Sequence, residues 1–135
     1  MLSFNPSILT LCSTEDGQPH LVGSRCHSCG TVYFPQQTLC IECLQEGTLK
    51  EHPLSRRGKL YSFTIVERES LAPPGFKVPY AYGYVELPEG VRVLSKIIGW
   101  KPGTLKMGAG VELVVEEIRE DSSGQKIMGF RFQLV

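Results

Sequence analysis

The sequence predicts a mostly β protein in which a small metal-binding hairpin precedes a five-stranded barrel. Two Cys-x-x-C pairs, separated by ten residues, lie in the first third of the chain. From Gly58 onward, five segments are rich in β-branched and aromatic residues and alternate in polarity, which is typical of strands. Frequent glycine (14) and proline (9) indicate short elements joined by many turns. We therefore assign residues 1–55 to an N-terminal segment with the hairpin, and residues 56–135 to the barrel.

The charge balance and hydropathy exclude several classes of protein. Lysine plus arginine (14) equals aspartate plus glutamate (14), whereas proteins that grip nucleic-acid phosphates need a basic face. Hydrophobic residues make up 41% of the chain, which is enough for a core and argues against wholesale disorder. The sequence contains no run of 18 apolar residues, and its first residues lack the pattern of a secretion signal. We expect a cytoplasmic protein without a membrane partner.

The first twenty residues predict little regular structure. A short apolar stretch, Ile8-Leu9-Thr10-Leu11, precedes the turn-forming pair Asp16-Gly17. Asn5-Pro6 favours the start of a brief helix.

Four of the five cysteines form two turns, Cys26-x-x-Cys29 and Cys40-x-x-Cys43. Each turn, called a knuckle below, brings two thiolates to one side of a tight loop. Two knuckles joined by a hairpin complete a tetrahedral four-thiolate site, which suits one zinc ion. Because all four positions are taken by protein ligands, the predicted zinc is structural and leaves no site for a catalytic water.

Alternatives to a zinc site are disulfides, separately buried cysteines and iron in the same thiolate geometry. Disulfides are rare in a reducing compartment, and nothing else in the sequence indicates electron transfer. Gly30 suits the close passage of the chain beside a metal in the first knuckle, whereas Leu44 stands where a glycine is more usual in the second.

The second half of the chain contains five predicted strands. Gly83 and Gly129 lie inside strands and are candidate bend points, which a sheet that curls onto itself requires. Five strands in about eighty residues fit an OB-type barrel, with an open sheet or a sandwich as alternatives. The predicted strands are residues 59–66, 80–87, 91–98, 111–116 and 127–134.

The order of these motifs resembles an acyl-CoA-associated family whose members combine a rubredoxin-like zinc ribbon with an OB-fold. The family includes the small subunit of benzoylsuccinyl-CoA thiolase. The resemblance covers residues 21–134, and many relatives carry a longer N-terminal helix than this chain. The matching segments are Gly23-Ser24-Arg25-Cys26-His27-Ser28-Cys29-Gly30, Pro35, Gly58-Lys59-Leu60-Tyr61-Ser62-Phe63-Thr64, Pro79-Tyr80, Val85-Glu86-Leu87-Pro88-Glu89-Gly90-Val91-Arg92 and Met107-Gly108.

The resemblance implies a role as accessory subunit in a thiolase-type complex. Members of the family accompany thiolase-like enzymes, and some bridge a thiolase to the next enzyme. The implied partner is a thiolase-like catalytic subunit in a hetero-oligomer, with CoA or acyl-CoA at the interface between the two chains.

The chain itself lacks the residues that thiolase chemistry needs. A thiolase uses a nucleophilic cysteine activated by a histidine, together with a second acid or base. Four cysteines are assigned to metal, and Cys12 has no histidine close in sequence. We therefore predict no catalytic residue in this chain and expect activity only in the complex.

Two segments are predicted to contact the partner or CoA, the loop before the second barrel strand and the basic cluster Arg56, Arg57 and Lys59 at the junction of hairpin and barrel. The loop Leu71–Tyr80 holds three prolines, two aromatic residues and a lysine, and OB-folds often bind through the loop between their first two strands. Trp100 is predicted to close one end of the barrel, with an interface anchor as its alternative. The predicted contact residues are Arg56, Arg57, Phe76, Lys77 and Tyr80.

Two other functions remain open at this stage. A nucleic-acid-binding module is the main alternative, because zinc ribbons and OB-folds both serve that role and Tyr61, Tyr82 and Tyr84 can stack on bases. The zero net charge argues against it. A rubredoxin-like electron carrier is the third hypothesis, and a colourless purified protein would exclude it.

Overall fold

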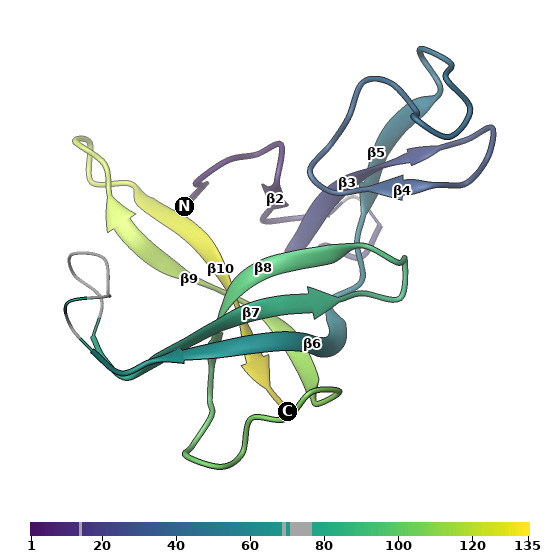
Figure 1. Ribbon diagram of the computed structural model, residues 1–135. Helices are drawn as coiled ribbons and strands as arrows, with labels where there is room; N and C mark the ends of the chain where they lie inside the picture. The colour runs from purple at the N-terminus through teal and green to yellow at the C-terminus, as the bar shows by residue number, and fades with distance from the viewer. Residues whose placement is uncertain (14, 69, 71–76) are drawn as a thin grey trace.

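The structure, a computed structural model, describes residues 1–13, 15–68, 70 and 77–135, which form ten strands in two sheets (Figure 1). No α-helix occurs among these residues, so none of the described chain forms a helix that could cross a membrane. The strands are β1 (Leu2–Ser3), β2 (Leu9–Thr10), β3 (His20–Cys26), β4 (Val32–Tyr33), β5 (Leu49–Pro53), β6 (Arg57–Val66), β7 (Tyr80–Glu86), β8 (Arg92–Ile98), β9 (Gly110–Glu120) and β10 (Lys126–Leu134).

The last five strands close into a barrel. Neighbouring strands follow the order β10-β8-β7-β6-β9, and β9 also pairs with β10, which returns the sheet to its start. The pairing of β8 with β10 is parallel, and the other pairings in this ring are antiparallel. The predicted five-stranded OB-type barrel is confirmed, and each of its strands overlaps a segment that the sequence predicts.

The barrel interior is filled by the side chains that face inward from its strands. Along β7 and β8, alternate residues face inward, so that Val85, Val93 and Ile97 are buried while their neighbours Tyr84 and Leu94 are exposed. These inward side chains form one apolar core cluster, and three buried residues from outside the barrel belong to it as well. They are Leu9, Leu21 and Leu54, each at most 1% exposed. The N-terminal segment and the hairpin therefore share one core with the barrel.

Gly83 permits a close approach between β6 and β7. A Cβ atom at this position would overlap the carbonyl oxygen of Ser62 and lie 2.8 Å from Cα of Phe63. The register between the two strands shifts between Leu60 and Ser62, which marks a β-bulge next to this contact. The sequence predicted a bend at Gly83, and the structure gives the glycine a steric reason.

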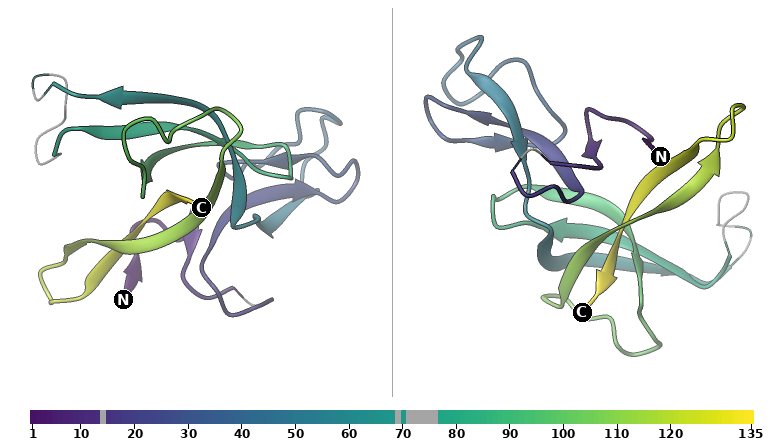
Figure 2. Two further views of the ribbon diagram at one scale, coloured as in Figure 1. Left: turned by 90° about the horizontal axis from the view of Figure 1, so that it is seen from below. Right: turned by 180° about the vertical axis from the view of Figure 1, so that it is seen from behind.

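The hairpin forms a separate small sheet beside the barrel. β3 pairs with β4 and β5 at its second half and with β2 at its first half, all antiparallel. Figure 2 shows this sheet to one side of the barrel, with the loops between β3, β4 and β5 at its outer end. The expectation of a brief helix at Asn5-Pro6 is wrong. The N–H groups of Ile8 and Leu9 both donate to the Asn5 carbonyl in a single turn, and the chain then leaves the turn to pair with β3.

Candidate functional site

The hairpin brings the four predicted ligands to one point. The Sγ atoms of Cys26, Cys29, Cys40 and Cys43 all lie within 4.8 Å of one another. Cys26 and Cys43 are 3.7 Å apart, and Cys29 and Cys40 are 3.5 Å apart. Tetrahedral zinc with Zn–S bonds of about 2.3 Å requires S–S separations of about 3.8 Å. The donor set and its spacing therefore fit one zinc ion.

The two knuckles have the same backbone turn. The N–H of Gly30 donates to the Cys26 carbonyl, and the N–H of Leu44 donates to the Cys40 carbonyl, each at 2.8 Å. Gly30 has a φ of 81° and Leu44 a φ of 54°, so both occupy the left-handed region. The leucine at position 44 therefore does not alter the second knuckle, although it adopts a conformation that favours glycine.

Three hydroxyl groups surround the sulfur atoms. Thr48 Oγ1 lies 3.3 Å from the Sγ atom of Cys26, and Thr31 Oγ1 lies 3.2 Å from that of Cys29. The Tyr33 hydroxyl lies 3.5 Å from the Sγ atom of Cys40. Such outer contacts orient the ligands of a metal and adjust their basicity. Sequence reasoning missed all three residues, since their spacing from the cysteines follows no motif.

Hydrogen bonding shifts the pKa values of three of the cluster's thiols in different directions. The Thr48 hydroxyl lowers the pKa of Cys26 to about 5, and the Tyr33 hydroxyl lowers the pKa of Cys40. The pKa of Cys43 is raised to about 11, chiefly by its hydrogen bond with Cys40 and then by burial. The pKa of Tyr33 is raised by the same Cys40 contact. A bound metal ion would favour the thiolate form of Cys43 against this raised pKa.

The remaining cysteine and one histidine lie outside the cluster. Cys12 is exposed in the N-terminal segment, and in the described part of the chain no hydrogen bond joins its thiol to a histidine. His20 is held by hydrogen bonds of 2.7 Å with the Leu54 carbonyl and with Asp16 Oδ2. The carboxylate of Asp16 has a lowered pKa, first because it accepts the N–H of Gln18 and then because of His20. His20 therefore fastens the N-terminal segment to the hairpin.

The four predicted contact residues that the structure describes do not gather at one place. Arg56 is half-buried, where its guanidinium donates to Gln18 Oε1 at 2.6 Å and to the Leu113 carbonyl at 3.2 Å. Arg57 is 76% exposed at the first residue of β6, 3.5 Å from Glu112. Tyr80, on β7, pairs with Val66, the last residue of β6, nine positions along that strand from Arg57.

Lys77 and Tyr80 lie together at that far end. Lys77 is exposed, and Tyr80 is only 8% exposed. Both line a hollow of about 400 Å³ together with Pro79 and Trp100. Trp100 is partly buried and packs against the barrel core. Phe76, the other predicted contact, lies outside the described residues.

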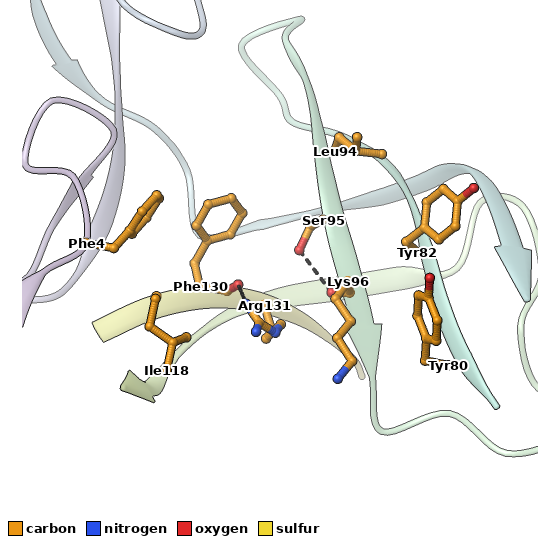
Figure 3. A pocket seen from close by; sticks show the side chains of 10 residues that line it. Phe4, Tyr80, Tyr82, Leu94, Ser95, Lys96, Ile118, Phe130 and Arg131 are labelled. Atoms are coloured by element: carbon orange, nitrogen blue, oxygen red, sulfur yellow. Dashed lines mark hydrogen bonds between the residues drawn. The ribbon is translucent and has the colours of Figure 1, made fainter. Parts of the chain in front are cut away.

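A second hollow opens beside Tyr80, in a place that the sequence did not indicate (Figure 3). It has a volume of about 360 Å³ and lies between β8 and the first half of β10. Aromatic and aliphatic side chains dominate its walls, and two cationic side chains, Lys96 and Arg131, reach it. Arg131 Nε lies 3.3 Å from Glu116 Oε1. The apolar wall residues are Phe4, Tyr80, Tyr82, Leu94, Ile118 and Phe130.

Family models match both parts of this architecture. Residues 16–48 match the ChsH2 rubredoxin-like zinc ribbon domain, and residues 51–116 match the ChsH2 C-terminal OB-fold domain. The chain belongs to this family. The resemblance of the sequence to proteins with a zinc ribbon and an OB-fold is thereby confirmed.

Curated relatives extend the match over nearly the whole chain. The benzoylsuccinyl-CoA thiolase subunit BbsA of Thauera aromatica is 36% identical over 98% of this chain and 88% of the relative. A DUF35 domain-containing scaffold protein of Methanocaldococcus jannaschii is 37% identical over 84% of this chain and 80% of the relative. A solved structure of an Ltp2-ChsH2(DUF35) aldolase gives a TM-score of 0.71 at 26% identity, covering 85% of this chain and 84% of the other.

Proposed function

We propose that this chain is a zinc-binding, non-catalytic accessory subunit of a thiolase-type acyl-CoA complex. The observation that carries the proposal is the match of the ChsH2-type zinc ribbon and barrel to a relative named as a thiolase subunit over 98% of this chain. Relatives named as scaffold protein and as part of an aldolase support an organising role. The chain then contributes surface and rigidity, and the partner contributes the reacting groups.

Zinc stabilises the hairpin in this proposal. One zinc ion would be held by Cys26, Cys29, Cys40 and Cys43, whose Sγ atoms have the required spacing. A bound zinc ion would supply cross-linking energy to a segment with few buried apolar side chains. Tyr33, Thr31 and Thr48 would orient the thiolates through their hydroxyl groups.

The described side chains support a non-catalytic role. Cys12 is the cysteine outside the metal cluster, and His20 is engaged with Leu54 and Asp16 rather than with a thiol. Activation of a cysteine nucleophile requires a base within hydrogen-bonding reach. We therefore assign the nucleophile and the acid/base groups to the catalytic subunit.

Acyl-CoA is proposed to lie at the boundary between the two subunits, near Lys77 and Tyr80. Two hollows adjoin this point and share Tyr80 as a wall, and both have the volume of small-molecule sites. The exposed Lys77 offers a cation to a CoA phosphate, while Phe76 from the same loop would contact the partner or the acyl chain. Arg56 and Arg57, at the other end of β6, would serve as contacts of the partner protein.

Co-expression with a thiolase-like catalytic subunit tests the proposal. We expect a stable complex, one zinc per copy of this chain, and CoA-dependent cleavage of a β-ketoacyl-CoA by the complex alone. Cleavage by the pure chain would contradict the non-catalytic assignment. Full activity of the thiolase-like subunit in the absence of this chain would contradict the accessory role.

One structural observation favours the nucleic-acid alternative. Tyr61, Tyr82 and Tyr84 are 48%, 38% and 45% exposed on β6 and β7, and the guanidinium of Arg92 lies 3.8 Å from the centroid of the Tyr61 ring. Exposed aromatic rings with a cation nearby can stack on bases. Salt-dependent retardation of a single-stranded oligonucleotide by the pure chain would support this alternative, and no retardation at low salt would remove it.

A further inference from the structure

The second knuckle keeps an apolar side chain in a conformation that suits glycine. Leu44 has a φ of 54°, where a Cβ atom is crowded by the backbone. Its side chain is 73% exposed, so little packing within this chain offsets the strain. Gly30 occupies the equivalent position of the first knuckle with the same hydrogen bond to its cysteine carbonyl. The isolated chain therefore carries this strain with little packing of the leucine to offset it.

Two further apolar side chains are exposed on the same knuckle. Ile41 is 64% exposed and Leu39 is 40% exposed. Ile41 lies within the turn, where its N–H donates to the Tyr33 hydroxyl at 3.0 Å, and Leu39 forms a β-bridge with Glu46. These contacts fix the backbone and leave the side chains facing outward. Leu39, Ile41 and Leu44, together with Glu42 and Glu46, are called the knuckle tip below.

The charges of the knuckle tip have a single sign. Glu42 and Glu46 are both exposed, and residues 38–47 contain no lysine or arginine. An apolar surface flanked by carboxylates complements an apolar groove bordered by basic residues. The same charges repel nucleic-acid phosphates and anionic lipid headgroups. Nucleic acid and anionic membranes are therefore disfavoured as partners of the knuckle tip.

We propose that the knuckle tip docks into an apolar groove bordered by lysine or arginine on the catalytic subunit. This inference rests on the proposed accessory function and adds the surface through which the zinc ribbon takes part in assembly. Leu44 and Ile41 enter the groove, and Glu42 and Glu46 pair with its rim. The strain at Leu44 is retained because the side chain acts in the complex rather than in the free chain.

Leu44→Gly separates a docking role from a structural one. If Leu44 stabilises the chain, the variant should melt at a lower temperature; if Leu44 docks onto the partner, the variant should keep its melting temperature and bind more weakly. The substitution relieves the left-handed strain and removes the docking side chain at once. We expect the variant to retain its zinc, to melt at the same temperature as the wild type or a few degrees higher, and to bind the catalytic subunit at least about tenfold more weakly. Ile41→Ser should weaken binding in the same way. The double variant Glu42→Lys/Glu46→Lys should weaken it further and reverse the salt dependence.

Met107→Ser is the matched control. Met107 is 75% exposed, close to the value for Leu44, and lies in the loop before β9. Binding would be measured by calorimetry or surface plasmon resonance with the purified catalytic subunit and the full chain. We expect the control to bind within about twofold of the wild type.

The outcomes distinguish this inference from the function on which it rests. If the wild-type chain forms no complex with the thiolase-like subunit, the proposed function fails and the docking site fails with it. If the wild type binds and all three knuckle-tip variants bind equally well, only the docking site is wrong. A dimer of the isolated chain that Leu44→Gly dissociates would assign the knuckle tip to a second copy and overturn the proposal.

Discussion

The hydroxyl oxygen of Tyr33 lies 3.5 Å from the Sγ atom of Cys40, so a phenol on β4 contacts a thiol of the second knuckle. The same oxygen accepts the N–H of Ile41 at 3.0 Å and that of Glu42 at 3.4 Å. One side chain therefore stabilises the negative charge on a sulfur atom and the backbone of the turn that carries it. Tyr33 connects the two knuckles, because β4 follows the first of them directly.

Replacement of Tyr33 by phenylalanine tests this contact. Tyr33→Phe removes the hydroxyl and leaves the N–H groups of Ile41 and Glu42 without their acceptor. We expect zinc affinity to fall about tenfold, at the lower end of the range for outer-shell contacts, with little change in the barrel. Competition with a chromogenic chelator measures the affinity, and Tyr61→Phe on β6 is the control. Equal zinc affinity in both variants would show that the Tyr33 hydroxyl does not act on the metal centre.

Cys40→Ser tests the assignment of the metal ligands. The serine hydroxyl does not replace a thiolate at zinc, so we expect loss of the metal and unfolding of residues 21–52. Leu21 belongs to the same apolar cluster as the barrel, so the remaining fold should expose part of that cluster and lose solubility. Elemental analysis gives the zinc content, with Cys12→Ser as the matched control that keeps one zinc. Full metal retention in Cys40→Ser would show that the ligand set is wrong.

Gly83→Ala tests the close approach of β6 and β7. The added methyl group would overlap the Ser62 carbonyl oxygen, and a backbone atom in the middle of a closed barrel cannot move far. We expect the free energy of unfolding to fall by about 3 kcal/mol, at the upper end of the range for overpacking. Gly124→Asn is the control, since Gly124 has a φ of 85° in open space and asparagine tolerates that region. Denaturant unfolding measures the free energy of unfolding of both variants. Equal stability of the two would contradict the steric argument.

Phe76→Ala tests the loop before β7. We expect the complex with the catalytic subunit to weaken by about 1–3 kcal/mol, as for an aromatic interface residue, while the melting temperature of the free chain stays unchanged. Binding measurements and thermal melts on the same preparations separate the two effects. A much lower melting temperature with normal assembly would make Phe76 a core residue instead.

The barrel strands and the cysteine cluster were predictable because their signals are local. Alternation along Tyr80–Glu86 and the spacing within each Cys-x-x-C turn depend on neighbours in sequence alone. The contacts of Thr48 and Tyr33 with sulfur depend on the pairing of three strands, which no short motif encodes. For the same reason the sequence grouped Arg57 with Tyr80 as contact residues, whereas β6 separates them by its full length. The sequence marked Leu44 as a leucine at a position more usual for glycine, and the structure adds that it keeps the left-handed turn.

The seam between β8 and β10, meaning the line along which these two strands pair, has the fewest paired residues of any strand pairing in the barrel. These strands pair only at Phe132 with Ile97 and at Gln133 with Ile98, whereas β10 pairs with β9 along its whole length. A short seam opens at a lower free energy than the rest of the wall, so its amide protons should exchange with solvent first. The hollow lined by Ser95 and Phe130 lies beside this seam. Local opening of this pairing would let the hollow widen around a bulky ligand while the other four strand pairings of the barrel stay intact.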